Sequence, residues 1–421
     1  MKLFVYFLCF SNIIFSQSIC DLKTRFNTYL NFNGSLNQSI TFTEKSVVIK
    51  SARKSEFTIY EGEQEILTAL LKTKKPSEFI PLYHWKKNNR LSKKQIDSLT
   101  KTISQVTYLS STSLQGKRIA IDPGHFAGNI TDARVEQKFI DFSPSSSNLL
   151  KDTVRFNEGT LTYQTAIILK HKLEEQGAIV MVTRPQQNYT SFQITYDSWF
   201  VKRKKIVLDS LVKVNGIDTK RYSVLMKLPK QKLFWEFFRD FELGERARLI
   251  NDFKPDATVI IHYNVDEKNT DWKNPTTKNY TMTFIGGGMT ADNFSKTINK
   301  IHFLRLLLSD QLNQSEKLAS LTVNQFNKEL HIPIAQKIDA DYLRDNCLKT
   351  SSPGVFCRNL ALCRMINSPL VYGEALYQDN IKECNQLCKN DYEINNQKVP
   401  KRIHETAMCY YQALLEYFSK P

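Results

Sequence analysis

The chain has 421 residues, of which 41% are hydrophobic and 24% charged, the balance of a folded globular protein with two or three domains rather than a disordered one. Its 14 glycines and 13 prolines, without a repeating period, exclude collagen, coiled-coil and low-complexity classes. The formal net charge of +16 favours a polyanionic partner, which leaves nucleic acid, a membrane surface and an acidic wall polymer open.

Residues 1–18 have the layout of a secretory signal peptide. A basic start is followed by an almost unbroken apolar run, residues 3–15, and then by small polar residues. The run is too short for a comfortable membrane span, and the alternative is a buried N-terminal strand or helix. We therefore expect an exported protein, either periplasmic or associated with the cell envelope. Cys20 adds the hypothesis of a lipoprotein, although residues 17–19 fit a lipidation signal poorly.

Export changes how the cysteines are interpreted. In an oxidising compartment we expect the six cysteines of the last quarter to form disulfides, in pairings that the sequence cannot rank. A structural zinc site through Cys384 and Cys388 is the competing interpretation, but no second ligand pair has matching spacing. Burial as free thiols is the third. The six are Cys347, Cys357, Cys363, Cys384, Cys388 and Cys409.

Residues 19–115 are polar and predict a small N-terminal segment or domain of unknown role. Helical patterns cover residues 61–72 and 92–106. No group of catalytic residue types occurs in this part of the chain.

From residue 116 to 421, short runs of β-branched residues alternate with helical patterns. We expect strands at residues 117–121, 178–183, 256–262, 280–285 and 368–372, and helices at 161–176, 244–253, 301–312 and 405–418. This alternation predicts an α/β domain with a central, mostly parallel or mixed sheet and helices on both faces. Two insertions interrupt it: residues 129–157 are Ser-rich and loop-like, and residues 186–241 are basic and aromatic.

Four polar residues stand where expected strands end or helices begin. Alone, each would more often be a packing residue, but the carboxyl ends of parallel strands line the ligand crevice of an open α/β sheet. Two histidines and a carboxylate are a ligand set of hydrolytic zinc, which leaves the fourth position to water. The four residues are His125, Glu158, His262 and Glu374.

The segments around these residues form four motifs in chain order, and the resemblance that they carry extends over roughly residues 117–418. They are GKRIAIDPGHF at 116–126, NEGTLTYQTAIILKHKLEEQGAIVMVTRP at 157–185, LGERARLINDFKPDATVIIHYN at 243–264 and SPLVYGEALYQDN at 368–380. Together they resemble the zinc-dependent N-acetylmuramoyl-L-alanine amidases of the Amidase_3 type, with their DPGH strand, Glu ligand helix, second His strand and catalytic Glu strand.

The resemblance implies a role for each matched residue. His125, Glu158 and His262 match the ligands of Zn²⁺, and Glu374 matches the carboxylate that takes a proton from the activated water and hands it to the departing amine. The cleaved bond would join the lactyl group of N-acetylmuramic acid to the L-alanine of the stem peptide. Peptidoglycan is then the partner.

Two further matched residues are candidates for substrate contact. Arg246 lies on the matched helix, where a structural tie is an equal alternative, and Asn264 follows the strand of the second His. The chain also departs from the family pattern. Phe126 and Ala127 stand where a second glycine usually follows DPGH, and Leu376 replaces the usual glycine after the catalytic Glu.

Other functions remain open at this stage. A zinc peptidase or amidase acting on another bond would use the same residues, and a non-catalytic cell-wall binding protein would keep the fold and the charge. The two insertions are candidates for gating the site, but the sequence identifies no regulatory partner. Export makes nucleic acid an improbable partner, so we expect the basic surface to hold the protein near peptidoglycan and anionic envelope polymers.

Overall fold

The structure is a computed structural model that describes residues 18–51, 54–102, 114–146, 150, 152–269, 272, 274–394 and 397–419. The expected signal peptide lies outside these residues except for Ser18, as does the end of the expected helix 92–106. The chain divides into two compact units. Unit 1 consists of Met1–Asn27, Ser35–Val106 and Ala291–Leu308, and the rest of the chain forms unit 2.

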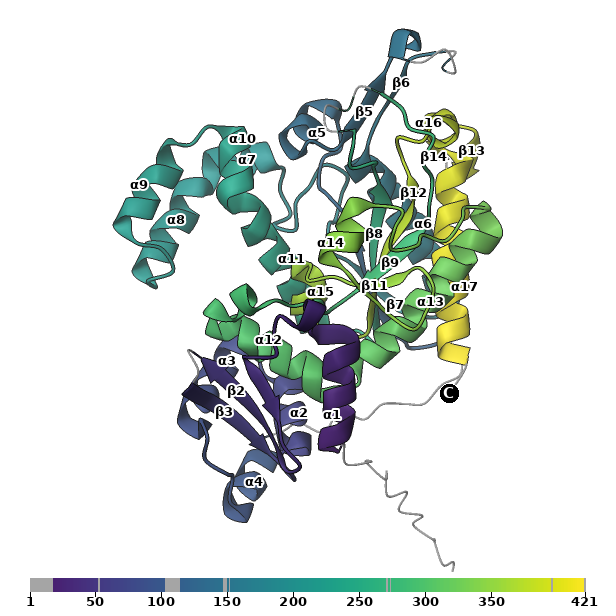
Figure 1. The fold of residues 1–421 in the computed structure, drawn as a ribbon. Coiled ribbons are helices and arrows are strands. Elements are labelled where there is room, and N and C mark those ends of the chain that lie inside the picture. Colours follow the sequence, from purple (N-terminus) through teal and green to yellow (C-terminus); the bar gives the residue numbers. More distant parts are fainter. Residues whose placement is uncertain are drawn as a thin grey trace, which may run out of the picture. The chain divides into compact units, whose positions relative to one another are not determined.

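Unit 1 contains a three-stranded antiparallel sheet that the sequence analysis missed. Its strands are short, and polar residues at their ends obscured the apolar alternation that buries Val47, Ile49, Phe57 and Ile59. Helices accompany the sheet (Figure 1). The elements are α1 (Ile19–Arg25), β1 (Ile40–Phe42), β2 (Ser46–Ser51), β3 (Lys54–Tyr60), α2 (Gln64–Thr73), α3 (Pro76–Lys86), α4 (Lys93–Thr100) and α12 (Thr297–Leu308).

The expected single helix 301–312 is wrong, because the chain breaks there. Helix α12 packs against α2 and α3 in unit 1, whereas α13 (Gln311–Leu330) begins a new helix in unit 2. The last carbonyl groups of α12 accept hydrogen bonds from side chains of unit 1: Arg25 donates to Leu307 O, and Thr68 donates to Leu308 O. These contacts end the helix by satisfying carbonyls that a longer helix would use. Unit 1 therefore includes a segment from the middle of the second half of the chain.

Unit 2 is built on a seven-stranded mixed sheet, which confirms the predicted fold class. Strands β12, β8, β4 and β7 are mutually parallel, β9 runs antiparallel to β12 and parallel to β11, and β10 is antiparallel to β11. The order is β10 (Leu348–Lys349), β11 (Val355–Cys357), β9 (Met282–Ile285), β12 (Leu370–Tyr377), β8 (Ala257–Asn264), β4 (Arg118–Pro123) and β7 (Ile179–Val182).

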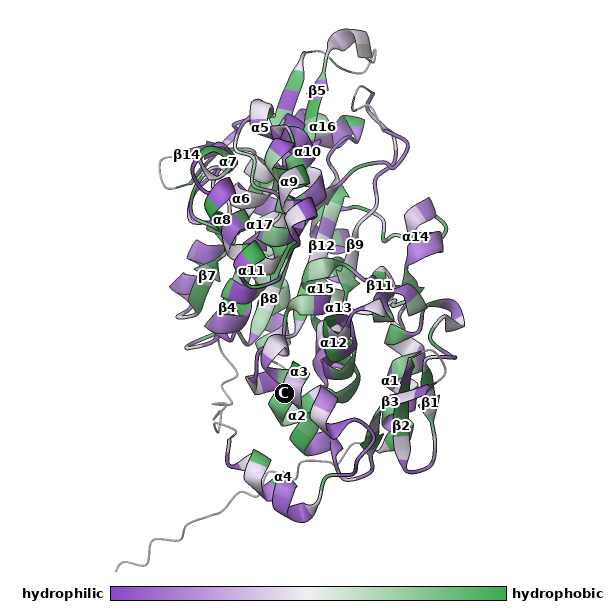
Figure 2. Cartoon of the chain, turned by 90° about the vertical axis from the view of Figure 1, so that its left-hand side faces the viewer, coloured by the Kyte–Doolittle hydropathy of each residue, from purple (hydrophilic) through white to green (hydrophobic). Residues whose placement is uncertain are grey.

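Helices cover both faces of this sheet (Figure 1). On one face α6 (Glu158–Glu175), α13 and α17 (Lys401–Ser419) pack side by side, and on the other α11 (Arg239–Phe253) packs with α15 (Ala361–Met365). Strand β8 is buried along almost its whole length, as expected for a central parallel strand covered on two sides. Its apolar character is visible in Figure 2.

The 129–157 segment is more ordered than the loop that its serines suggested. It contains α5 (Ile130–Glu136) and an antiparallel hairpin that leads directly into α6. The hairpin strands are β5 (Phe139–Phe142) and β6 (Val154–Asn157).

Four smaller elements occur later in unit 2. They are α14 (Asp341–Asn346), α16 (Ile381–Leu387), β13 (Tyr392–Ile394) and β14 (Gln397–Val399).

The 186–241 segment forms a helical insertion with its own apolar core. Tyr196, Trp199 and Phe238 are buried at its centre, and the ring of Phe126 joins them, with its centroid 5.6 Å from that of Tyr196. The core explains why Phe126 replaces glycine beside His125. The helices are α7 (Tyr196–Lys202), α8 (Lys204–Lys213), α9 (Thr219–Lys227), α10 (Lys230–Leu233) and the π-helical turn η4 (Phe234–Phe238).

The expected disulfides do not occur, because all six cysteines of the last quarter are free. All but Cys388 are buried, where a thiol packs as a small apolar group. Several thiols are turned to separate backbone acceptors: Cys347 Sγ donates to Tyr342 O and Cys384 Sγ to Gln378 O. Along the described part of the chain, no helix combines the length and apolarity needed to cross a membrane.

Candidate metal centre

The four predicted site residues lie at the carboxyl-terminal edge of the parallel strands. His125 follows β4, Glu158 is the first residue of α6, and His262 is near the end of β8. On the neighbouring strand β12, Glu374 is in register with His262. The backbone of β12 has an irregularity just after Glu374, in the segment where Leu376 departs from the family pattern.

Three of these side chains meet as a cluster that could hold a metal ion. One ligand atom from each of His125, Glu158 and His262 lies within 4.8 Å of the other two. The imidazole rings of the two histidines are nearly perpendicular, with centroids 5.0 Å apart. Nitrogen and carboxylate donors of this kind are those that zinc prefers. The structure thus brings the predicted ligands together.

Glu158 is the centre of the cluster. Its Oε1 lies 3.0 Å from His262 Nδ1 and accepts from the backbone N–H of Tyr263, while its Oε2 lies 3.3 Å from His125 Nε2. Gln378 donates to Oε2 at 2.9 Å, which fixes the carboxylate from the opposite side. These contacts engage both oxygens of the carboxylate.

His125 is held in an unusual backbone conformation by Glu136. The φ of His125 is +59°, in the left-handed region that costs a non-glycine residue about 1 kcal/mol or more. The Glu136 carboxylate accepts from the backbone N–H groups of Phe126 and Ala127 and lies 3.3 Å from His125 Nδ1. With Nδ1 engaged, Nε2 is the nitrogen that faces Glu158. Carboxylates commonly orient metal-binding histidines in this way.

Two buried arginines support the same loop from below. Arg246 donates to Pro123 O and His125 O and pairs with Asp122 and Glu242. Arg184 donates to Pro123 O and to Gly159 O at the start of α6. The loop that carries His125 therefore rests on a network of charged groups whose donors are satisfied.

Gly124 of the DPGH motif is required by close packing. A Cβ at this position would collide with the imidazole ring of His262. Only glycine lets the β4 loop approach the histidine of β8 so closely.

The charges of the cluster shift the pKa values of its members. Burial alone would lower the pKa of His125, but Glu158 and Glu136 outweigh it and raise the pKa to about 9. Burial would raise the pKa of Glu158, yet His125 and Lys138 hold it well below its usual range. Burial lowers the pKa of His262, with Glu158 opposing. The opposite shifts of the two pKa values both favour an ion pair between His125 and Glu158.

Glu374 differs from the ligands in having no such support. Its buried Oε2 has no hydrogen-bond partner within the described ranges. Burial, and then the negative charge of Glu158, raise the pKa of Glu374 to about 8. A carboxyl group with a pKa near neutrality can both accept and release a proton under physiological conditions.

A cation and an aromatic wall border the cluster. Lys138 Nζ lies 3.9 Å from Glu158 Oε2 and 5.4 Å from the ring centroid of Trp272. Trp272 stacks on Phe139 of β5, and on the other side the ring of His262 stacks on Tyr372. The cluster is thus flanked by flat apolar surfaces and one positive charge.

The two candidates for substrate contact lie differently. Arg246 is 2% exposed, and its contacts are with the loop and with two carboxylates, so we interpret it as a positioning residue. Asn264 donates to Tyr342 Oη at 2.8 Å and is partly buried. Its contact with substrate stays a prediction.

Several residues around the cluster were not singled out from the sequence. Glu136 and Lys138 belong to the segment interpreted as a loop, so nothing marked them. Arg184 and Gln378 had a signal that was not used, since each follows the end of a strand of the parallel sheet within a quoted motif.

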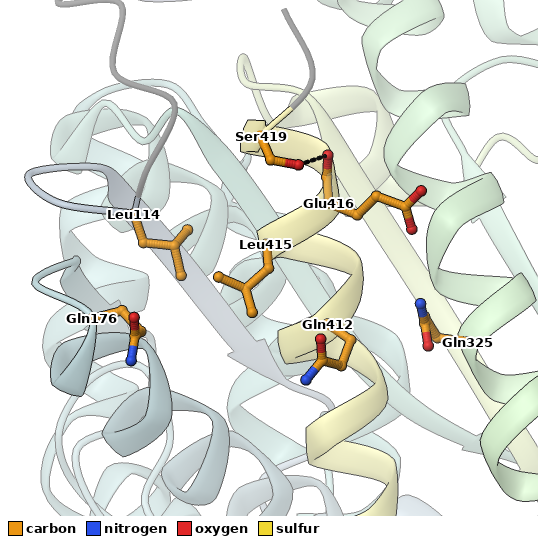
Figure 3. Close-up of a pocket in the computed structure, with 7 residues that line it drawn as sticks. All are labelled: Leu114, Gln176, Gln325, Gln412, Leu415, Glu416 and Ser419. Carbon is orange, nitrogen blue, oxygen red and sulfur yellow. Dashed lines mark hydrogen bonds between the residues drawn. The ribbon is translucent and has the colours of Figure 1, made fainter.

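A hollow of about 380 Å³, shown in Figure 3, has a lining that shares no residue with the cluster. Its lining comes from the segment before β4, the end of α6, helix α13 and the last turns of α17. No histidine or cysteine lines it. The residues are Leu114, Gln176, Gln325, Gln412, Leu415, Glu416 and Ser419.

Comparison with known proteins identifies the family. The sequence profile described as Amidase_3, N-acetylmuramoyl-L-alanine amidase, matches residues 119–403, which is more than half of the chain and includes all four site residues. The chain belongs to this family, and the membership supports the peptidoglycan amidase function predicted from the sequence. No curated protein matches the chain significantly.

Solved structures with a similar chain course include further amidases. Ami1 of Mycobacterium smegmatis is 14% identical, covering 73% of this chain and 100% of that one at a TM-score of 0.40. The CwlD amidase of Clostridioides difficile, solved in complex with the GerS lipoprotein, is 14% identical with coverage of 73% and 100% and a TM-score of 0.38. At these values neither likeness carries an argument, and the assignment rests on the family profile.

Proposed function

We propose that this chain is an exported, zinc-dependent amidase that hydrolyses the bond between N-acetylmuramic acid and the L-alanine of the stem peptide. One observation carries the proposal: His125, Glu158 and His262 converge within 4.8 Å, beside the partly buried carboxyl group of Glu374, whose buried Oε2 has no hydrogen-bond partner among the described residues. The donor set fits zinc in type and number, and the three protein ligands leave a position for water or substrate.

In this proposal the side chains of the three ligands are oriented before a metal ion binds. The Zn²⁺ ligands would be His125 Nε2, His262 Nδ1 and the Glu158 carboxylate. Two further residues orient these donors from outside the cluster: Glu136 contacts His125, and Gln378 donates to Glu158. Bound zinc supplies a Lewis acid that makes a water nucleophilic near neutral pH and polarises a carbonyl group.

Glu374 would carry the proton. Its Oε2 accepts the proton of the attacking water and then donates it to the nitrogen of the departing L-alanine. The raised pKa suits the second step, since a carboxyl group with a pKa of about 8 holds a proton at neutral pH and can pass it on. For the first step, the charge of a bound cation would favour the ionised form of Glu374 that accepts the proton. The flat walls of Trp272 and Tyr372 and the cation of Lys138 would border the bound substrate.

Digestion of purified peptidoglycan tests the proposal. We expect zinc-loaded protein to release stem peptides that begin with L-alanine, identified by mass spectrometry, and to leave glycan strands without peptides. Shorter peptides lacking L-alanine would instead indicate a zinc peptidase. The absence of any product, together with no bound zinc, would indicate a wall-binding protein.

Residues 1–18 and the net charge support the cellular part of the proposal. A signal peptide would export the chain to the periplasm or the cell envelope, where lipidation of Cys20 stays a hypothesis. Peptidoglycan and anionic envelope polymers would attract a chain with a net charge of +16.

A further inference from the structure

We propose that the helical insertion formed by α7 to η4 docks the protein on an anionic lipid bilayer. The insertion is the basic and aromatic stretch whose role the amidase reaction does not explain. It belongs to unit 2, and Figure 1 shows α8 and α9 at its outer end, away from the central sheet.

The outward-facing residues of the insertion lie outside its apolar core. Its interior is filled by the aromatic core around Trp199 and by leucines of the inner helix faces, Leu208 on α8 and Leu225 on α9. The outer faces are therefore free to carry any soluble sequence, and a surface helix would normally carry polar residues there.

The outer faces instead carry large apolar side chains. They include some of the most exposed apolar side chains of the described structure, with Val201 79% and Val214 69% exposed. Figure 2 shows hydrophobic and hydrophilic residues mixed along these helices. The set is Val201, Ile206, Val214, Val224 and Trp235. Exposed apolar residues gathered in one segment indicate an interaction surface.

Exposed cations lie on the same helices as these apolar residues. On α9, Lys220, Val224 and Lys227 follow at spacings of four and three, which places all three on one side of the helix. Across the junction of α7 and α8, Lys202 and Lys205 are adjacent in sequence to Val201 and Ile206 and are exposed like them. Among the described residues, no acidic side chain lies within salt-bridge distance of Lys202, Lys220 or Lys227.

This combination selects a bilayer over a soluble polyanion. A polymer such as polyphosphate would satisfy the lysines but would leave the valines, the isoleucine and the tryptophan in water. An anionic membrane satisfies both, because headgroup phosphates meet the cations while apolar side chains enter the boundary between headgroups and acyl chains. Tryptophan in particular favours that boundary.

Cosedimentation of the purified full chain with vesicles tests the proposal. We expect binding to vesicles of phosphatidylglycerol and phosphatidylcholine, at least tenfold weaker binding to phosphatidylcholine alone, and a loss of affinity in high salt. Fluorescence gives a second reading: the emission should shift to shorter wavelength on binding, and Trp235→Phe should remove most of that shift.

Two combined variants separate the contributions. The apolar variant carries Val201→Ser, Ile206→Ser and Val224→Ser, and the charge variant carries Lys202→Gln, Lys220→Gln and Lys227→Gln. We expect each to weaken vesicle binding at least fivefold, with the circular dichroism spectrum and the hydrolysis of a small soluble fragment unchanged.

Matched controls use exposed residues of the same unit outside the insertion. They are Lys328→Gln, Lys349→Gln and Lys389→Gln for charge and Ile338→Ser for apolarity, and they should bind within twofold of the wild type. Equal weakening by the controls, or no binding to anionic vesicles, would overturn the proposal. A third result would also overturn it: the apolar variant binds vesicles as well as the wild type does, and polyphosphate abolishes that binding. That result would identify a polymer as the partner.

Discussion

The candidate centre has two sides that are held in different ways: the three clustered ligand candidates form one, and Glu374 of β12 forms the other. On the ligand side, His125 and Glu158 are fixed by hydrogen bonds and ion pairs to Glu136, Gln378 and the arginine network beneath the loop. On the β12 side, Glu374 keeps a buried oxygen without a described partner, and burial raises its pKa. The first arrangement suits the proposed role of holding a metal ion in one geometry. The second retains the energetic cost of an unpaired carboxyl group, which a substrate or water can relieve.

The largest effect is expected at Glu374, the proposed proton carrier. Glu374→Gln removes the proton acceptor, so we expect hydrolysis to fall by roughly 10²- to 10⁴-fold while zinc content stays at one ion per chain. Rates on a soluble muropeptide and metal analysis of the same sample measure both quantities. Glu329→Gln, on the surface, is the control. A variant that keeps its activity would remove Glu374 from the mechanism.

The arginine network should matter for stability before it matters for chemistry. Arg246→Met leaves Asp122 and Glu242 without their buried cation, and we expect a loss of about 3–5 kcal/mol in the free energy of unfolding. The matched control is Arg248→Met, two residues along α11, whose exposed ion pairs are worth about 0–1 kcal/mol. Urea denaturation measures the difference, and equal losses for both variants would contradict the supporting role of Arg246.

A smaller effect is expected from the residue that orients His125. Glu136→Gln keeps the size of the side chain but weakens its hold on His125 Nδ1, so zinc affinity should fall by about 10- to 100-fold. Competition with a zinc-binding dye measures the change. Asp141→Asn on the nearby hairpin should leave the affinity unchanged, and unchanged affinity in Glu136→Gln itself would show that His125 needs no outer support.

Acidity should weaken the ligand side gradually. Because the pKa of His125 is about 9 without metal, zinc must displace one proton at any lower pH, whereas Glu158, with its lowered pKa, is already ionised. Zinc affinity should therefore fall about tenfold for each pH unit below 9. Titrations between pH 6 and 8 check the slope, and a flat profile would mean that His125 is neutral before the metal binds.

The sequence predicted that the four candidate residues lie at one edge of the sheet, and this placement depends on local features. His125, His262 and Glu374 lie on or just beyond strands with clear apolar runs, and the parallel arrangement brings such positions to one edge. The contact of Glu136 with His125 could not be predicted from the sequence, because Glu136 lies on α5, in a segment whose serines suggested a loop. The departure at Phe126 could be interpreted only with the structure, which places its ring in the core of the insertion.

Errors elsewhere have the same origin in long-range contacts. The helix expected at 301–312 is divided because its first part packs in unit 1, a pairing that no local pattern reveals. The disulfides were inferred from the cysteine count and the expected compartment, whereas burial and separate backbone acceptors explain the thiols. Local periodicity locates helices and strands, whereas tertiary contacts decide which of these elements pack together.

The most direct test of the central claim is a crystal structure of the zinc-loaded protein with data collected at the zinc absorption edge. The account predicts one strong anomalous peak about 2.0–2.2 Å from a nitrogen of His125, a nitrogen of His262 and an oxygen of Glu158, with the carboxyl group of Glu374 facing the remaining position. A peak at Cys384 and Cys388, or no ordered zinc between the two histidines, would contradict it.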